Sequence, residues 1–141
     1  MGSRRKARII AFQALFGWDM NRVSPEELTQ FQWLDEERKE RLDEETLSFA
    51  RLIVAGVVEN LDTIDAAIRF QLENWDFSRL ARVDLAILRM SVYSLFYLKE
   101  IPPSVTIDEA VDIVKEFGSD DSYRFINGVL DGIRKAQSTI R

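Results

Sequence analysis

The chain has 141 residues, 46% of them hydrophobic, and a formal net charge of −5. This length suits one domain that buries about two-thirds of the surface of its unfolded chain. The sequence contains no cysteine and no histidine, which excludes thiol nucleophiles, Ser-His-Asp triads, histidine bases and the usual zinc sites. We therefore expect no cofactor and no metal. The absence of cysteine, of a leader and of an apolar run of about 18 residues predicts a soluble cytoplasmic protein.

The charge is unevenly distributed along the chain. Four cations precede the first acidic residue, Asp19, and form a basic run: Arg4, Arg5, Lys6 and Arg8. Removing these four charges from the total of −5 leaves −9 for the rest, and residues 35–45 are particularly acidic. A basic segment on an acidic body is typical of a protein that contacts an anion locally.

Apolar periodicity predicts a succession of helices with no alternating strand pattern. A first helix should end near Met20, with the basic run projecting beyond its packed part. Ser24 and Pro25 are typical of a helix start, and the short helix that follows should carry Leu28, Phe31 and Leu34. The acidic stretch is then a loop or a solvated helix face. Two more helices should follow it, over residues 47–60 and 64–72.

The longest helix is expected to run from a cap at Ser78 to about Lys99, at the centre of the fold, with Arg89 on its polar side. Asp84 falls on its apolar face, where an unpaired carboxylate would cost several kcal/mol. We expect an internal salt bridge there rather than a ligand contact. A capping box over residues 106–109 should start the next helix, and Gly118 should end it as a left-handed cap. With the last helix, this makes seven.

The last helix leaves one aromatic off its apolar stripe. At about 100° per residue, four apolar positions gather on one side: Ile126, Val129, Leu130 and Ile133. Phe125 falls away from them, beside Asp121, Gly128 and Gly132. Two interpretations follow, a ring that packs closely against another helix or a ring that stacks on a nucleic-acid base. This stretch alone favours the packed ring.

Several segments occur together in a fixed order: Arg4-Arg5-Lys6-Ala7-Arg8, Gln13-Ala14-Leu15-Phe16, residues 80–89, Ile101-Pro102-Pro103, Asp108-Glu109-Ala110-Val111 and residues 117–131. In this order and spacing the chain resembles the NusB family of transcription antitermination factors. The resemblance implies an all-α fold, with an N-terminal and a C-terminal helical half packed as one compact domain over residues 1–141. It also implies a non-enzymatic role with three partners: boxA RNA, the ribosomal protein NusE and the RNA polymerase antitermination complex on ribosomal RNA operons.

The resemblance also assigns site residues. RNA binding falls on the basic run Arg4, Arg5, Lys6 and Arg8, and on Asp121 and Phe125 in the last helix. Arginines on phosphates and an aromatic under a splayed base suit single-stranded RNA. Gln13 is a weaker RNA-binding candidate, because an ordinary solvated glutamine explains it equally well. For Asp84 the family suggests proximity to NusE.

Two other classes of protein remain as alternatives. NusB-like domains also occur as the RNA-binding part of ribosomal RNA cytosine methyltransferases. This chain lacks a Gly-rich cofactor loop, a cysteine nucleophile and strand-helix alternation, so we do not expect that activity. The other alternative is a helical interaction protein whose basic run binds an acidic protein surface.

Overall fold

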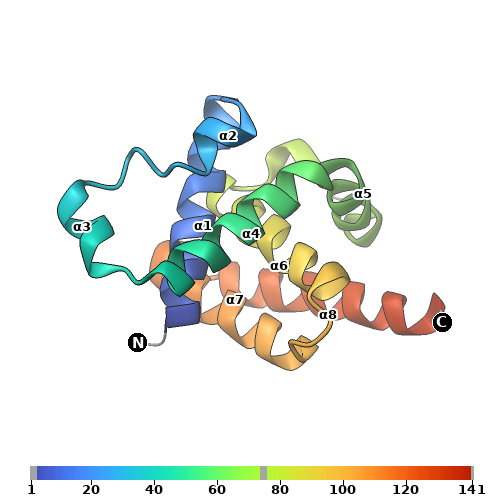
Figure 1. Cartoon of the computed structure of the whole chain (residues 1–141). Helices are drawn as coiled ribbons and strands as arrows, with labels where there is room; N and C mark the ends of the chain where they lie inside the picture. Colours follow the sequence, from blue (N-terminus) through green and yellow to red (C-terminus); the bar gives the residue numbers. More distant parts are fainter. Residues whose placement is uncertain (1–2, 74–75, 141) are drawn as a thin grey trace.

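The computed structural model describes residues 3–73 and 76–140, and these fold entirely into helices and connecting loops (Figure 1). The elements are α1 (Ser3–Met20), α2 (Pro25–Leu28), α3 (Glu36–Arg41), α4 (Glu44–Glu59), α5 (Leu61–Leu72), η1 (Phe77–Arg79), α6 (Arg82–Tyr97), α7 (Pro103–Phe117) and α8 (Ser122–Ile140). The all-α class is confirmed. The described residues form eight α-helices rather than seven, because the acidic stretch contains the short α3.

The central element is α6, as predicted. It packs against α1, α4, α5, α7 and α8, and every residue from Asp84 to Leu95 is buried. In Figure 1 it lies in the middle of the molecule, between α4 and the pair α7 and α8. The first helix joins this arrangement through α4 and α6, and α7 packs along α8. Residues from both ends of the chain therefore share one core.

The predicted bounds of α6 are wrong at the N-terminal end. Asp76 accepts hydrogen bonds from the Ser78 backbone N–H at 2.9 Å and from its hydroxyl at 2.7 Å. This closes the 3-10 turn η1, and α6 begins only at Arg82. The helix has 16 residues against 19 in α8, so it is not the longest.

The predictions for the two ends of α7 are also wrong. The helix begins at Pro103, whose fixed φ suits a first helical position, so Thr106 lies inside its first turn instead of capping it. Val105, also in this first turn, is 42% exposed. Gly118 follows the helix with φ −98° and ψ −170°, which is extended backbone and not a left-handed cap.

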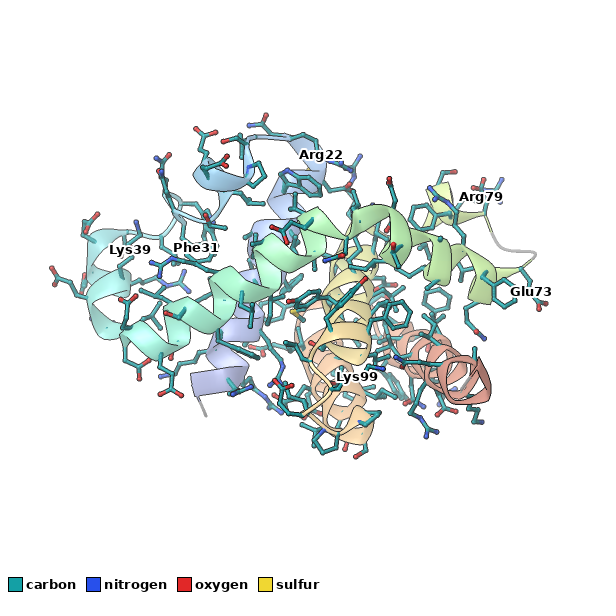
Figure 2. The ribbon with its side chains drawn as sticks, turned by 45° about the vertical axis from the view of Figure 1, so that its right-hand side comes forward. Arg22, Phe31, Lys39, Glu73, Arg79 and Lys99 are labelled. Carbon is teal, nitrogen blue, oxygen red and sulfur yellow. The ribbon has the colours of Figure 1, made fainter. Side chains whose placement is uncertain are left out.

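The segment between α1 and α4 stands apart from the packed helices (Figure 1). Ser24 caps α2 as predicted, accepting a hydrogen bond from the Glu27 backbone N–H at 3.2 Å, but the helix ends at Leu28. Phe31 and Leu34 are buried in the loop beyond it, Phe31 with φ 51°. Figure 2 shows Phe31 on the inner side of this segment. The helix α3 buries none of its residues and is the solvated helix face that the sequence allows.

A buried ion cluster joins three helices at the end opposite to the basic run. Arg89 is 4% exposed and donates two hydrogen bonds of 2.9 Å to Asp65 on α5. It donates a third, of 3.2 Å, to Asp19 on α1. Burial opposes the charge of Arg89, but the two carboxylates outweigh it and raise its pKa. The expectation that Arg89 lies on the polar side of α6 is therefore wrong.

Candidate nucleic-acid interface

We expected the basic run to project beyond the packed part of the first helix, but it does not. The helix α1 begins at Ser3 and includes all four cations, so their side chains spread around its surface. Arg4 and Lys6 are exposed, Arg5 is half-buried and Arg8 is only 6% exposed. The packed part of α1 thus reaches back into the run, and Ala7 is fully buried within it.

Two of the four cations are paired with acidic side chains of α7. The guanidinium of Arg5 donates to both oxygens of Glu109 and, at 2.7 Å, to Asp112. Arg8 donates to the same Glu109 carboxylate at 3.3 Å. Hydrogen bonds to Glu109 and Asp112 raise the pKa of Arg5, whereas burial lowers that of Arg8. These two arginines hold α1 against α7, and RNA phosphates would have to compete with the carboxylates for Arg5.

Arg4 and Lys6 are the cations of the run with no carboxylate partner within salt-bridge distance among the residues described. The Arg4 guanidinium lies over the ring of Phe49 on α4, 4.3 Å from its centroid. Such a contact positions a cation without neutralising it. A cleft of about 670 Å³ is lined by three cations, two carboxylates and three apolar residues: Arg4, Arg5, Arg8, Glu100, Glu109, Ile101, Pro102 and Val105. The cleft therefore offers cations and apolar side chains within one space, with Glu100 and Glu109 as competing acids.

An ordinary solvated glutamine was the alternative to RNA binding for Gln13, and the structure does not support it. It is half-buried, and its Oε1 is buried with no hydrogen-bond partner in the described structure. Next to it on α1, Phe12 contacts Phe117 at the end of α7, with ring centroids 5.2 Å apart. The buried Oε1 is out of reach of a base, so a contact of Gln13 with a base edge stays a prediction for its amide nitrogen only.

At the start of α8 the structure bears only on the packed interpretation of Phe125, and base stacking stays a prediction. The ring is half-buried and packs against the core, while Asp121 is exposed. The two glycines differ: an added Cβ at Gly132 would lie 2.1 Å from the Gln71 side chain on α5, whereas Gly128 faces open space. Close helix packing therefore occurs at Gly132, two turns after Phe125. Part of the ring remains accessible.

The cations of the basic run and Phe125 lie near different points along α1 and α7. Arg5 pairs with Glu109 and Asp112 near the middle of α7, whereas Phe12 meets Phe117 at its end. Seven residues of helix separate Arg5 from Phe12, or about 10 Å. Since α8 starts just after Phe117, a ligand that touches both the basic run and Phe125 must be extended, as a nucleic-acid strand is.

Asp84 is buried as predicted, but within residues 3–73 and 76–140 it forms no salt bridge of the kind expected. It is 7% exposed, and the hydroxyl of Ser122, the first residue of α8, donates to its Oδ2 at 3.1 Å. Its Oδ1 is buried without a hydrogen-bond partner among the described residues. Burial raises the pKa of Asp84, and the Ser122 hydroxyl offsets this only partly. The carboxylate fastens α6 to the start of α8.

This arrangement predicts the sign of a pH effect. A carboxyl whose folded pKa is raised binds its proton more tightly in the folded state, so ionisation of Asp84 destabilises the fold as pH rises. We expect the difference in free energy of unfolding, Asp84→Asn minus wild type, to become more positive between about pH 4 and pH 7. Urea titrations at several pH values measure this difference. A constant difference would contradict the assignment.

Four important residues were not predicted as partners of charged side chains. Glu109 belongs to the expected capping box and Ser122 to the segment of residues 117–131, but neither pattern indicated its partner. Asp112 and Phe49 carry no motif of their own. Their partners lie far away in sequence: Arg5 is separated from Glu109 by 104 residues, and Asp84 from Ser122 by 38. The position of Asp84 on an apolar face indicated that a partner must exist, but not where it is.

Comparison with known proteins decides the family. The profile of the NusB family matches residues 5–135. The chain belongs to the NusB family. It is 54% identical over 133 residues to the transcription antitermination protein NusB of Treponema pallidum (strain Nichols), covering 94% of this chain and 93% of that protein.

Solved structures of the NusB family have the same fold. The structure of T. maritima NusB is 40% identical, with a TM-score of 0.83 over 94% of this chain and 90% of that one. A structure of antitermination factors NusB and NusE in complex with dsRNA matches at 30% identity, with a TM-score of 0.83 over 95% of this chain and 97% of that one. Within the described ranges of this NusB family protein, no helix is long and apolar enough to span a membrane.

Proposed function

We propose that this NusB family protein is a cytoplasmic transcription antitermination factor that acts by binding and not by catalysis. Its ligand is boxA-type RNA, bound together with the ribosomal protein NusE, within the RNA polymerase antitermination complex on ribosomal RNA operons. The observation that carries the proposal is the presence of two exposed cations on α1, Arg4 and Lys6, together with a partly accessible aromatic, Phe125, at the start of α8. Residues 1–141 act as a single RNA-binding domain.

The site residues take different roles in this proposal. Arg4 and Lys6 contact phosphates directly, because no carboxylate neutralises them in the described structure. Arg5 and Arg8 contribute less, since Glu109 is shared between them. Phe125 stacks on a base, and Asp121 accepts hydrogen bonds from bases or riboses. Gln13 offers its amide nitrogen to a base edge, because its Oε1 is buried. Asp84 acts indirectly, by holding the start of α8 and the surface that NusE approaches.

An RNA titration tests the proposal. Fluorescence anisotropy would follow binding of a labelled single-stranded boxA oligonucleotide, a scrambled strand of equal length and a boxA duplex, each with and without NusE. Preference for the boxA strand over the scrambled strand is expected. The duplex is included because the related NusB and NusE complex was solved with dsRNA. Binding to an acidic protein surface with none to any RNA would favour the interaction protein instead.

We expect NusE to strengthen RNA binding. A protein with a net charge of −5 and few unpaired cations should bind RNA weakly by itself, and a basic partner that touches both reduces the repulsion. Positive coupling of about 1–3 kcal/mol is expected, equal for both ligands by linkage. Calorimetry of RNA binding at zero and saturating NusE measures it. Equal affinities would show that the two ligands bind independently.

A further inference from the structure

A second basic cleft lies between α1 and α3. It has a volume of about 280 Å³ and is lined by Lys6, Ile9, Ile10, Arg38, Arg41 and Leu42. Three of these six residues are cations, and the other three form an apolar floor. Lys6 belongs to the basic run, whereas the two arginines come from a segment to which neither the sequence nor the family comparison assigns a function.

The charges of α3 are partly sorted between its two sides. At about 100° per residue, Arg38 and Arg41 lie about 60° apart, while Glu36 and Glu40 are at least about 100° from either. Glu37 is the exception, about 40° from its ion-pair partner Arg41. Lys39 also points away, about 100° from Arg38 and about 160° from Arg41. The helix buries none of its residues, so core packing does not explain this sorting. It turns two cations of an acidic stretch toward α1.

Two carboxylates lie near this cleft, and neither blocks it. Glu37 accepts a hydrogen bond from Arg41 at 2.5 Å, but both side chains are more than 70% exposed, and such surface pairs are weak and easily exchanged. Asp43 caps α4 by accepting a hydrogen bond from the Thr46 backbone N–H at 2.8 Å. That contact with Thr46, helped by the charge of Lys6, keeps the pKa of Asp43 below its usual value. Arg38 and Lys6 have no carboxylate within salt-bridge distance in the described structure.

We propose that this cleft is a second phosphate-binding site for RNA, in which Arg38 and Arg41 of α3 extend the cationic surface of Lys6 on α1. The inference rests on the proposed RNA-binding function and deepens it, because it assigns a part of the RNA path to the segment between α1 and α4. Arginine suits this role, since its planar fork matches phosphate oxygens. The apolar floor accommodates the ribose or the base attached to that phosphate.

The test is the salt dependence of RNA binding by the full chain. We would compare wild type, Arg38→Gln, Arg41→Gln and their double variant, using the labelled single-stranded boxA oligonucleotide with NusE present. Each lost phosphate contact on a single strand lowers the slope of log K against log salt by about 0.7, which corresponds to about fivefold weaker binding at 0.1 M salt. The double variant should lose about twice that slope.

Lys39→Gln is the matched control, because it removes the same charge from the same helix outside the cleft. It should leave the slope nearly unchanged. An equal loss of slope in Lys39→Gln would overturn the inference, since only net charge would then matter. A wild-type slope in the Arg38 and Arg41 variants, with Lys6→Gln still reducing it, would overturn the second site but leave RNA binding intact. If wild type binds none of the RNAs, the proposed function itself fails. Unchanged unfolding midpoints confirm that the variants fold, as expected for a helix with no buried residues.

Discussion

Asp65→Ala is expected to lower the free energy of unfolding by about 3 kcal/mol. The substitution leaves the Arg89 guanidinium buried without its two hydrogen bonds of 2.9 Å. Removing one partner of a buried pair costs about 3–5 kcal/mol, because the other charge stays in a poorly solvated place. The lower end applies here, since Asp19 still accepts one hydrogen bond from Arg89. Urea denaturation followed by circular dichroism measures the change.

Two further variants separate the buried pair from charge in general. Asp62→Ala removes an exposed acid from the same helix and should change the free energy of unfolding by less than about 0.5 kcal/mol. The double variant Asp65→Leu with Arg89→Met should recover most of the loss, because apolar side chains of similar volume replace both charges. A double variant as unstable as Asp65→Ala would show that the cluster does more than balance Arg89.

Phe125→Ala is expected to weaken RNA binding about ten- to a hundredfold. Base stacking on an aromatic contributes about 1–3 kcal/mol, which corresponds to that range. The structure adds a cost in stability that an exposed ring would not have, because Phe125 is half-buried against the core. This cost should stay below the about 3–5 kcal/mol of a fully buried phenylalanine. Anisotropy titrations and urea denaturation measure the two effects separately.

Two control variants on α8 show which effect dominates. Phe125→Tyr keeps an aromatic face and should preserve most of the RNA affinity. Val129→Ala, one turn further along the helix, shortens a side chain that is 7% exposed. It should lower stability without changing the RNA affinity of the folded protein. If Phe125→Ala behaves like Val129→Ala, the ring belongs to the core and the RNA site lies elsewhere.

Predictions that rest on neighbours in sequence succeeded best. Ser24 caps α2 by a hydrogen bond to a backbone group three residues away, so its sequence context was sufficient. The capping box at Thr106 failed because a second local signal, the proline at 103, starts α7 earlier. The predicted left-handed cap at Gly118 is wrong because a glycine after a helix can also adopt extended φ and ψ, as it does here. Local patterns thus predicted the order of the helices more reliably than their bounds.

Predictions about charged residues depended on partners that the sequence does not reveal. Asp84 was correctly placed on the apolar face of α6, but Ser122 and not a cation satisfies it. Arg89 was misplaced because periodicity treats every arginine as polar surface, while its carboxylates lie 24 and 70 residues away. Arg8 was misplaced in the same way, because its buried guanidinium donates a hydrogen bond to the distant carboxylate of Glu109. The sequence predicted which residue types form the candidate RNA site. It did not predict that carboxylates of α7 neutralise two of its arginines.

The packing of α1 has a consequence for how the protein is made. This helix emerges from the ribosome before the helices it packs against, α4 and α6, and Phe12 meets Phe117. About a hundred residues must be translated after Phe12 before the contact with Phe117 can form, which takes about 5–20 s at bacterial elongation rates. Until then the apolar stripe of α1 is exposed on the nascent chain, a natural substrate for chaperones that bind emerging polypeptides. The core is therefore completed only after the later helices have been synthesised.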